Sequence, residues 1–229
     1  MPHREAAAAK RIREHVANLG NPDKKIARRA EDSLIRYYGS RALEPLIGAC
    51  ADADAPARSR AVWALGKTCD PRAYETILRL TTDLEGYVRY DAAIALGVLG
   101  DMRATVPLIA LMQKPDVRHS VDSAAATGLN KLGRPAVPAL LDVLQNGAST
   151  ARCLAAGVLG SIGDDRAIGL LAKLLSGSDQ EARIAAIEAL ALIGGGDSLA
   201  HIQSCLQDPI PQVRETADYW AKESERARM

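Results

Sequence analysis

Residues 91–104 read Asp-Ala-Ala-Ile-Ala-Leu-Gly-Val-Leu-Gly-Asp-Met-Arg-Ala, and close variants of this segment recur along the chain. Residues 154–167 read Leu-Ala-Ala-Gly-Val-Leu-Gly-Ser-Ile-Gly-Asp-Asp-Arg-Ala. Residues 60–73 read Arg-Ala-Val-Trp-Ala-Leu-Gly-Lys-Thr-Cys-Asp-Pro-Arg-Ala. Self-similarity with a period of about 31 residues is typical of a stacked solenoid, in which each repeat packs only on its neighbours.

An arginine near the start of most repeats sets the register. Arg58 and Arg89 are 31 residues apart, and the same spacing separates Arg152, Arg183 and Arg214. Small and large apolar residues follow three and seven positions later, which places them on one face of a helix. We therefore expect the first helix of each repeat to bury the pairs Ala61 and Leu65, Ala92 and Leu96, Ala155 and Leu159, and Ala186 and Leu190.

The same register predicts a turn and a second helix. The glycine pairs at 97 and 100 and at 160 and 163 suit a helix C-terminus followed by a left-handed turn. Asp70, Asp101 and Asp164 come next, where a second helix needs an N-cap. Each repeat is thus predicted to be a helical hairpin.

The chain is therefore predicted to be all-α, a single α-solenoid array over residues 1–229 with about six hairpins and polar terminal caps. The hairpins are expected at about 24–52, 56–83, 87–114, 120–146, 150–176 and 181–207, and the capping helices at about 3–18 and 212–226. The fourth hairpin departs from the pattern, because Asp122 takes the arginine position and Val117-Arg118-His119 is extra linker before a predicted N-cap at Ser120. We expect a local change of stacking there. Gly194–Gly196 predicts a looser turn in the sixth hairpin.

Composition narrows the functional classes. Hydrophobic residues make up 48% of the chain and Phe is absent, so the core must come from Leu, Ile, Val and Ala. The net charge is +1, with 12 basic and 8 acidic residues among the first 60, which favours a solvated face over a nucleic-acid or membrane surface. No apolar run reaches the length of a signal peptide or a membrane span, so a cytoplasmic location is expected. The four cysteines lack the spacing of a zinc site or a disulfide framework.

The pattern resembles the HEAT-like repeat named for phycobilisome lyase subunits. The resemblance lies in Val88-Arg89, Ala95-Leu96-Gly97, Gly100-Asp101-Met102-Arg103-Ala104 and Pro107-Leu108-Ile109, and it covers roughly residues 24–220. It implies that the repeated arginines reach acidic turn residues of a neighbouring repeat, for which Asp70, Asp101 and Asp164 are the matching acids. It also implies that the second helices line the concave side of the array.

Enzymatic function finds little support in the residues. Deoxyhypusine hydroxylase, a HEAT-like enzyme, holds iron with His-Glu pairs, but none of His3, His15, His119 and His201 is followed by Glu. The HEAT-like DNA glycosylases need a basic, aromatic groove around an aspartate, and the second helices here offer few basic residues. No phosphate-binding glycine loop is present, because Gly194–Gly196 lacks the Lys-Ser/Thr that would follow. We therefore expect no cofactor and no metal site, although residues distant in sequence could still form a catalytic group.

The favoured prediction is a protein-binding scaffold, adaptor or assembly factor that takes a helix or an extended peptide in its concave groove. The predicted partner-binding residues are Trp63, Tyr74, Glu75, Arg79, Gln113, Asp142 and Lys173. Trp63 stands out because its position is Ile94, Gly157, Glu188 and Tyr219 in other repeats, so it is not a fixed core site. Six of the eight aromatic residues lie within the first 90, where they either fill gaps between the first repeats or form an aromatic binding patch over hairpins one to three. The alternative, from the resemblance, is a subunit of a bilin chromophore lyase or a chromophore-handling chaperone. The oligomeric state is left open.

Overall fold

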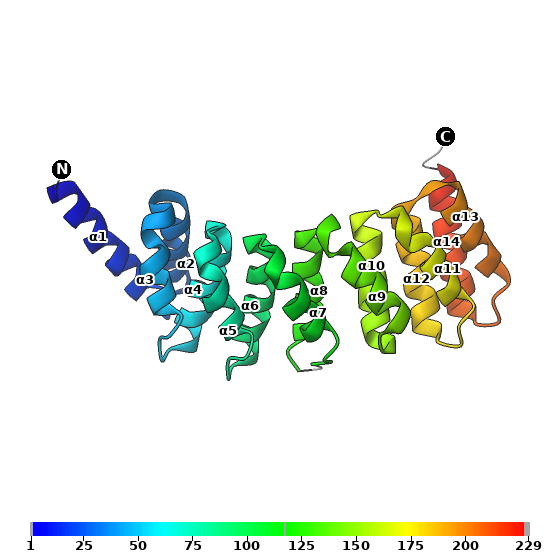
Figure 1. Cartoon of the computed structure of the whole chain (residues 1–229), viewed down its shortest axis with the longest axis horizontal. Coiled ribbons are helices and arrows are strands. Elements are labelled where there is room, and N and C mark those ends of the chain that lie inside the picture. The colour runs from blue at the N-terminus through cyan, green and yellow to red at the C-terminus, as the bar shows by residue number, and fades with distance from the viewer. Residues whose placement is uncertain (1, 117, 227–229) are drawn as a thin grey trace.

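The computed structural model describes residues 2–116 and 118–226, and within them it contains fourteen α-helices and no strand. The helices stand side by side in one elongated array, with the termini at opposite ends (Figure 1). Consecutive helices pair as antiparallel hairpins, and each hairpin packs on the next. The all-α solenoid predicted from the repeat is confirmed.

Six hairpins lie between two flanking helices, α1 (Pro2–Ala17) and α14 (Pro211–Arg226). Their first helices are α2 (Lys24–Ser33), α4 (Ala55–Thr68), α6 (Gly86–Leu99), α8 (Val121–Leu132), α10 (Ser149–Ile162) and α12 (Gln180–Ile193). Their second helices are α3 (Leu43–Ala49), α5 (Tyr74–Leu80), α7 (Thr105–Met112), α9 (Val137–Asn146), α11 (Ile168–Leu175) and α13 (Gly195–Ser204). The first hairpin differs from the rest, because a π-turn over Leu34–Tyr38 extends α2.

The turn inside a hairpin is built as its sequence predicts. Gly100 and Gly163 adopt left-handed backbone angles (φ 76° and 69°), and Cys69 takes the same conformation at φ 52° in the second hairpin. The following aspartate caps the short 3₁₀ turn that begins the second helix; Asp101 Oδ1, for example, accepts a hydrogen bond of 2.9 Å from the Arg103 amide. The left-handed residue reverses the chain and the carboxylate satisfies a free N–H.

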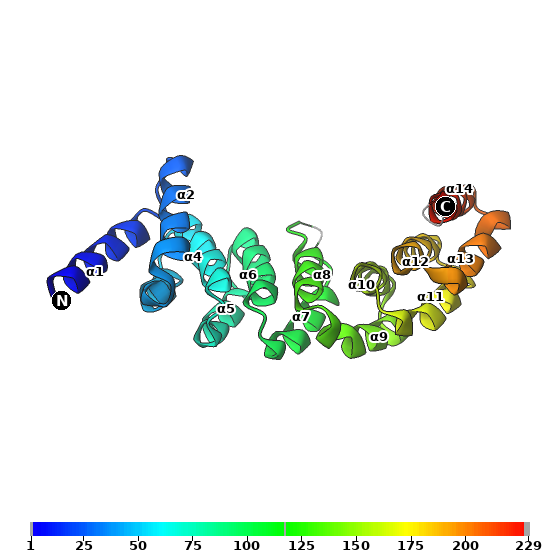
Figure 2. The ribbon, with the colours of Figure 1, turned by 90° about the horizontal axis from the view of Figure 1, so that it is seen from above.

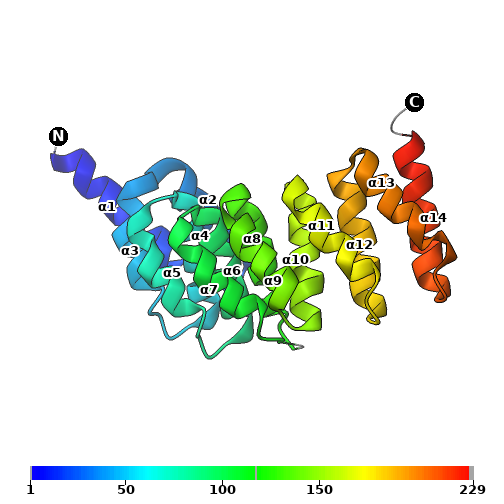
Figure 3. The same cartoon turned by 45° about the vertical axis from the view of Figure 1, so that its right-hand side comes forward.

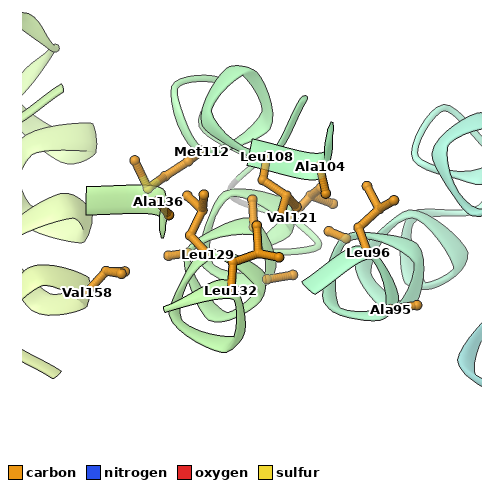
Figure 4. Packing of buried hydrophobic residues seen from close by; sticks show 14 of the residues in the cluster. Ala95, Leu96, Ala104, Leu108, Met112, Val121, Leu129, Leu132, Ala136 and Val158 are labelled. Carbon is orange, nitrogen blue, oxygen red and sulfur yellow. The ribbon is translucent and has the colours of Figure 1, made fainter. Parts of the chain in front are cut away.

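The repeated leucines form a continuous core. Leu65, Leu96, Leu159 and Leu190 have no exposed surface, as predicted. Figure 4 shows Leu96, Leu108 and Leu129 pointing into a shared layer between α6, α7 and α8. Because every layer is shared by adjacent hairpins, the array has one core along its whole length.

Neighbouring first helices touch backbone to backbone at glycine. A Cβ on Gly66 would lie 2.8 Å from the Ala95 oxygen, and a Cβ on Gly97 would lie 2.2 Å from the Gly128 oxygen. Gly160 meets Ala189 on α12 in the same way, at 2.7 Å. These glycines lie inside the helix, directly after the repeated leucine, and allow close helix–helix contact. They do not end the helix, contrary to the prediction for Gly97 and Gly160.

These contacts decide which way the array curves. Successive first helices pack closely, whereas successive second helices meet at few points. The layer with the closer spacing must lie inside the arc, and Figure 2 shows α4, α6, α8, α10, α12 and α14 along its inner side. Figure 3 shows α10, α12 and α14 standing roughly parallel in that layer. The expectation that the second helices line the concave side is therefore wrong.

The fourth hairpin breaks this packing. The residue after its repeated leucine is Asn130, not glycine, and α8 and α10 meet at fewer points than α6 and α8 do. Ser120 precedes α8 with φ 53° and makes no side-chain capping bond, so the predicted cap is wrong. Part of the predicted linker, Val117, lies outside the described residues. The turn at Gly194 is tight, not loose, because α13 begins at Gly195 directly after it.

Candidate protein-binding face

The repeated arginine joins adjacent hairpins. Arg58 Nε lies 2.8 Å from Asp83 Oδ2, and its Nη2 donates to Asp83 Oδ1 at 2.8 Å. Arg58 Nη1 donates to the carbonyl oxygens of Asp52 and Ala53, at 2.9 and 3.0 Å. One guanidinium therefore binds the loop before its own helix and the loop before the next hairpin. All three nitrogen atoms of the guanidinium are engaged in these contacts.

The acidic partners are not the ones that the resemblance implied. Arg89 pairs with Asp116 (3.4 Å) and Arg183 with Asp208 (3.1 Å), in the loops between hairpins. Asp101 instead binds Arg103 two residues later, at 2.7 Å, and Asp70 and Asp164 bind Arg72 and Arg166 in the same way. The reason is distance: the arginine lies in the first turn of a helix that is about 20 Å long, and these aspartates follow its far end.

Two pairs are missing around α10. Asp122 replaces the arginine of the fourth hairpin, is buried, and accepts a hydrogen bond from the Ser123 amide. Arg152 keeps the arginine, but the position matching Asp83 and Asp208 is Gly177, three residues before α12. The Nε atom of Arg152 is buried without a hydrogen-bond partner among the described residues. In the described part of the chain, the arginine–aspartate pair is therefore absent on both sides of α10.

The inner face presents the positions that vary between repeats. Trp63 on α4 corresponds to Ile94, Gly157, Glu188 and Tyr219, each five residues after the repeated arginine. A hollow that contains Gly157 and Glu188 is lined by first helices alone, so this row of positions faces the inside of the arc. The repeated residues stabilise the stacking of the hairpins, and the variable residues lie along the inner face.

The hollow has a volume of about 390 Å³ and lies where α8, α10 and α12 meet. We call it the inner-face hollow. Ser123 and Thr127 of α8, Leu154 and Gly157 of α10, and Glu188 and Leu192 of α12 are among its lining residues. Asn130 also lines it, at the junction where the glycine contact is lost. Sequence reasoning missed these side chains as a site, although Gly157 and Glu188 already stood out in the variable row.

The predicted partner-binding residues divide between the two faces. Trp63 lies on the inner face, half-buried, with the Lys67 ammonium 5.0 Å from its ring centroid. The exposed residues on or at the end of the second helices lie on the outer layer: Glu75, Arg79, Gln113, Asp142 and Lys173. The structure does not bring these two groups together, because the two helix layers face opposite ways.

Tyr74 is a packing residue. Its side chain is 6% exposed, and its hydroxyl donates to the Arg103 carbonyl oxygen at 3.1 Å. The Arg103 guanidinium covers its ring at 4.1 Å from the centroid. Tyr74 therefore joins hairpins two and three and does not offer a free surface, contrary to its predicted role.

Two titratable groups on the first helices, Cys153 on α10 and Asp91 on α6, have raised pKa values. Burial is the main cause that raises the pKa of the Cys153 thiol, with Asp179 and Glu181 adding to it, so this cysteine is a poor nucleophile. Burial likewise raises the pKa of Asp91, which accepts a hydrogen bond from Ser59 on α4. Within the described ranges, no group of three or more His, Cys, Asp or Glu side chains is arranged to hold a metal ion. No helix in the same part of the chain is long and apolar enough to span a membrane.

A larger hollow of about 570 Å³ lies between α1 and α3, lined by Ile12, Val16 and Pro45 with Arg13 and Arg41 beside them. It lies where the terminal helix meets the first hairpin. It is therefore a feature of the end of the array and not of the repeating inner face.

The chain belongs to the HEAT repeat family. The family model of HEAT repeats matches residues 12–97, 75–152 and 137–220, which together span most of the chain. A comparison with curated proteins found no match.

Solved structures with the same fold include an archaeal HEAT-like repeats protein from Thermococcus onnurineus NA1. It is 14% identical over 90% of this chain and 98% of its own, with a TM-score of 0.51. The complex of CpcE and CpcF of phycocyanin lyase from Nostoc sp. PCC7120 is 24% identical over 92% and 93%, with a TM-score of 0.49. Human deoxyhypusine hydroxylase is 20% identical over 99% and 100%, with a TM-score of 0.44. The likeness to the archaeal protein shows the repeat fold and leaves function to the residues of the site.

Proposed function

We propose that this protein is a non-catalytic scaffold or adaptor that binds another protein along its inner face. The observation that supports this is that, within each repeat, the residues that stabilise stacking are separate from the residues that vary along the inner face. The arginine, alanine, leucine and glycine positions serve stacking, while the row from Trp63 to Tyr219 varies in size and charge and lies along the inner layer. A row of varied side chains on a rigid curved support suits recognition of an extended or helical segment.

Exposed aromatic residues on or beside this row support binding along it. Tyr90 on α6 is 36% exposed and precedes Ile94 by one helical turn, next to the row that begins at Trp63. Tyr219 on α14 is 57% exposed and packs edge-on against Trp220, with ring centroids 5.2 Å apart. Exposed aromatic side chains are enriched in protein interfaces because they bury a large area at a low cost in conformational entropy.

Site-specific photocrosslinking tests the proposal. A benzophenone amino acid replaces Trp63 or Tyr219 on the inner layer, and Arg79 or Lys173 on the outer layer as matched controls. After irradiation in the native lysate, we expect the two inner positions to yield one common protein adduct and the two outer positions to yield none.

The other outcomes identify other functions. Adducts from Arg79 and Lys173 alone would place binding on the outer residues predicted from the sequence and would overturn the inner-face proposal. An adduct with a phycobiliprotein subunit, or one that carries a visible bilin absorbance, would support the chromophore-handling alternative. Turnover of a small molecule without any protein adduct would contradict the scaffold itself.

A further inference from the structure

The inner-face hollow is shaped by residues that the fold itself does not require. Gly157 is exposed in the middle of α10, and a Cβ built on it would have no heavy atom within 4 Å. Glycine inside a helix costs about 0.5–1 kcal/mol relative to alanine. Gly66, Gly97 and Gly160 have a packing reason for that cost, since a neighbouring helix touches them. Gly157 has no such packing reason. The absence of a side chain at Gly157 leaves open space at the surface of α10.

The junction beside Gly157 adds depth to this space. Asn130 occupies the position where Gly66 and Gly97 allow close helix contact, so α8 and α10 cannot approach in the same way. The two missing arginine–aspartate pairs lie on the same two sides of α10. The hollow therefore lies beside the α8–α10 junction, which is more loosely packed than the junctions of α6 with α8 and of α10 with α12.

The lining defines what fits the hollow. Leu192 is 53% exposed, and Leu154 is partly exposed beside it, so an apolar floor faces solvent. Glu188 is the one charged side chain among the lining residues, all of which are described. The other polar groups of the lining are neutral hydroxyl, amide and thiol groups. An aliphatic group next to a positive charge complements this surface.

We propose that the inner-face hollow takes an aliphatic side chain of a partner segment, with an adjacent lysine or arginine of that segment pairing with Glu188. The inference rests on the protein-binding function proposed above and specifies its partner as a basic, aliphatic peptide. Leu154 on α10 and Leu192 on the neighbouring α12 bury the aliphatic group between them. Glu188 fixes the register of the segment through its charge.

Selection from a phage-displayed library of random peptides against the full-length chain tests this. We expect the enriched peptides to carry Lys or Arg within one helical turn of Leu, Ile or Met. Their affinities for variants are then measured by fluorescence anisotropy. Gly157→Leu fills the hollow, and Glu188→Lys reverses its charge; each is expected to weaken binding about tenfold or more. Gly169→Leu is the matched control, because Gly169 is an exposed glycine on the outer helix α11 with equally open space, and it should leave affinity unchanged.

The variants also have a folding control. Gly157→Leu is expected to keep or raise the melting temperature, so lost binding cannot be blamed on unfolding. Acidic enriched peptides, no enrichment, or full affinity of Gly157→Leu would each overturn the proposal. Peptides that bind the Gly157→Leu variant normally but do not bind the Trp63→Ala variant would overturn the hollow as the binding site. They would leave the proposed protein-binding function intact. Self-association of the chain that Gly157→Leu abolishes would identify a second copy as the occupant and overturn the basic peptide.

Discussion

Arg58 and Asp83 form a two-point ion pair between consecutive hairpins, with both N–O distances at 2.8 Å. The Asp83 carbonyl oxygen in turn accepts a hydrogen bond of 2.8 Å from Arg89, the arginine of the next repeat. One aspartate thus connects two arginines 31 residues apart. The pair is largely buried, with side-chain exposures of 14% and 8%. Removing one partner therefore leaves the other charge poorly solvated.

We predict that Asp83→Asn lowers the free energy of unfolding by about 1.5–3 kcal/mol, the usual contribution of hydrogen bonds to a charged group. Arg58→Ala should cost at least as much, because it also frees the Asp52 and Ala53 carbonyls. Urea denaturation measures both. In the double variant the losses should be clearly less than additive; additive losses would contradict a direct pair.

Stability should fall in acid through the same carboxylate. Hydrogen bonds from the Arg58 guanidinium are the main cause that holds the pKa of Asp83 below its ordinary value of about 3.9. A carboxyl with a lowered pKa stabilises the fold fully above its unfolded value, and this contribution is lost as the pH falls below about 4. We expect the melting temperature of Asp83→Asn to decline less between pH 5 and about pH 3 than that of the unaltered chain. Parallel curves would show that Asp83 does not contribute.

Gly177→Asp should stabilise the array by restoring the partner that Arg152 lacks. The new carboxylate would stand where Asp83 and Asp208 stand, although the Leu174 oxygen, 3.2 Å from the new Cβ, must shift slightly. We expect a gain of about 1 kcal/mol, and none when Arg152→Met is added. The control Gly169→Asp introduces the same charge at an exposed helix position that does not face an unpaired arginine. An equal gain there would attribute the effect to general charge.

Two glycines should respond oppositely to alanine. Gly97→Ala forces a Cβ to within 2.2 Å of the Gly128 oxygen, so the helices must separate at a cost of about 1–3 kcal/mol. Gly157→Ala meets no atom and should gain about 0.5–1 kcal/mol from helix propensity. Thermal denaturation of both variants compares them directly. A loss at Gly157 would show that its open space is needed for the fold itself.

Leu96→Ala tests the core. This leucine has no exposed surface and lies in the layer that hairpins three and four share. We expect a loss of about 2–5 kcal/mol in the free energy of unfolding. Exposed Leu84, at 94% exposure, gives a control whose alanine variant should unfold like the unaltered chain.

Much of the site could not be found from helical phase alone. The variation between repeats predicted that the position occupied by Trp63, Ile94, Gly157, Glu188 and Tyr219 lies outside the fixed core, and the structure places that row on the inner face. The resemblance to HEAT-like repeats implied a groove on the second helices, which lie on the outer layer. It also implied that the arginines pair with Asp70, Asp101 and Asp164, which cap their own turns. Tyr74 was expected at the surface and is buried by Arg103.

The repeat, its register and its buried leucines follow from the sequence by itself, because each depends on residues within one hairpin or on its nearest neighbour. The Asp caps and the left-handed glycines are equally local. The direction of curvature was decided only in the tertiary structure. It depends on how closely two layers of helices approach across different repeats, at backbone contacts such as Gly66 with Ala95 and Gly97 with Gly128. Those contacts bring the first helices together, and so they turn the variable side chains toward the inside of the arc.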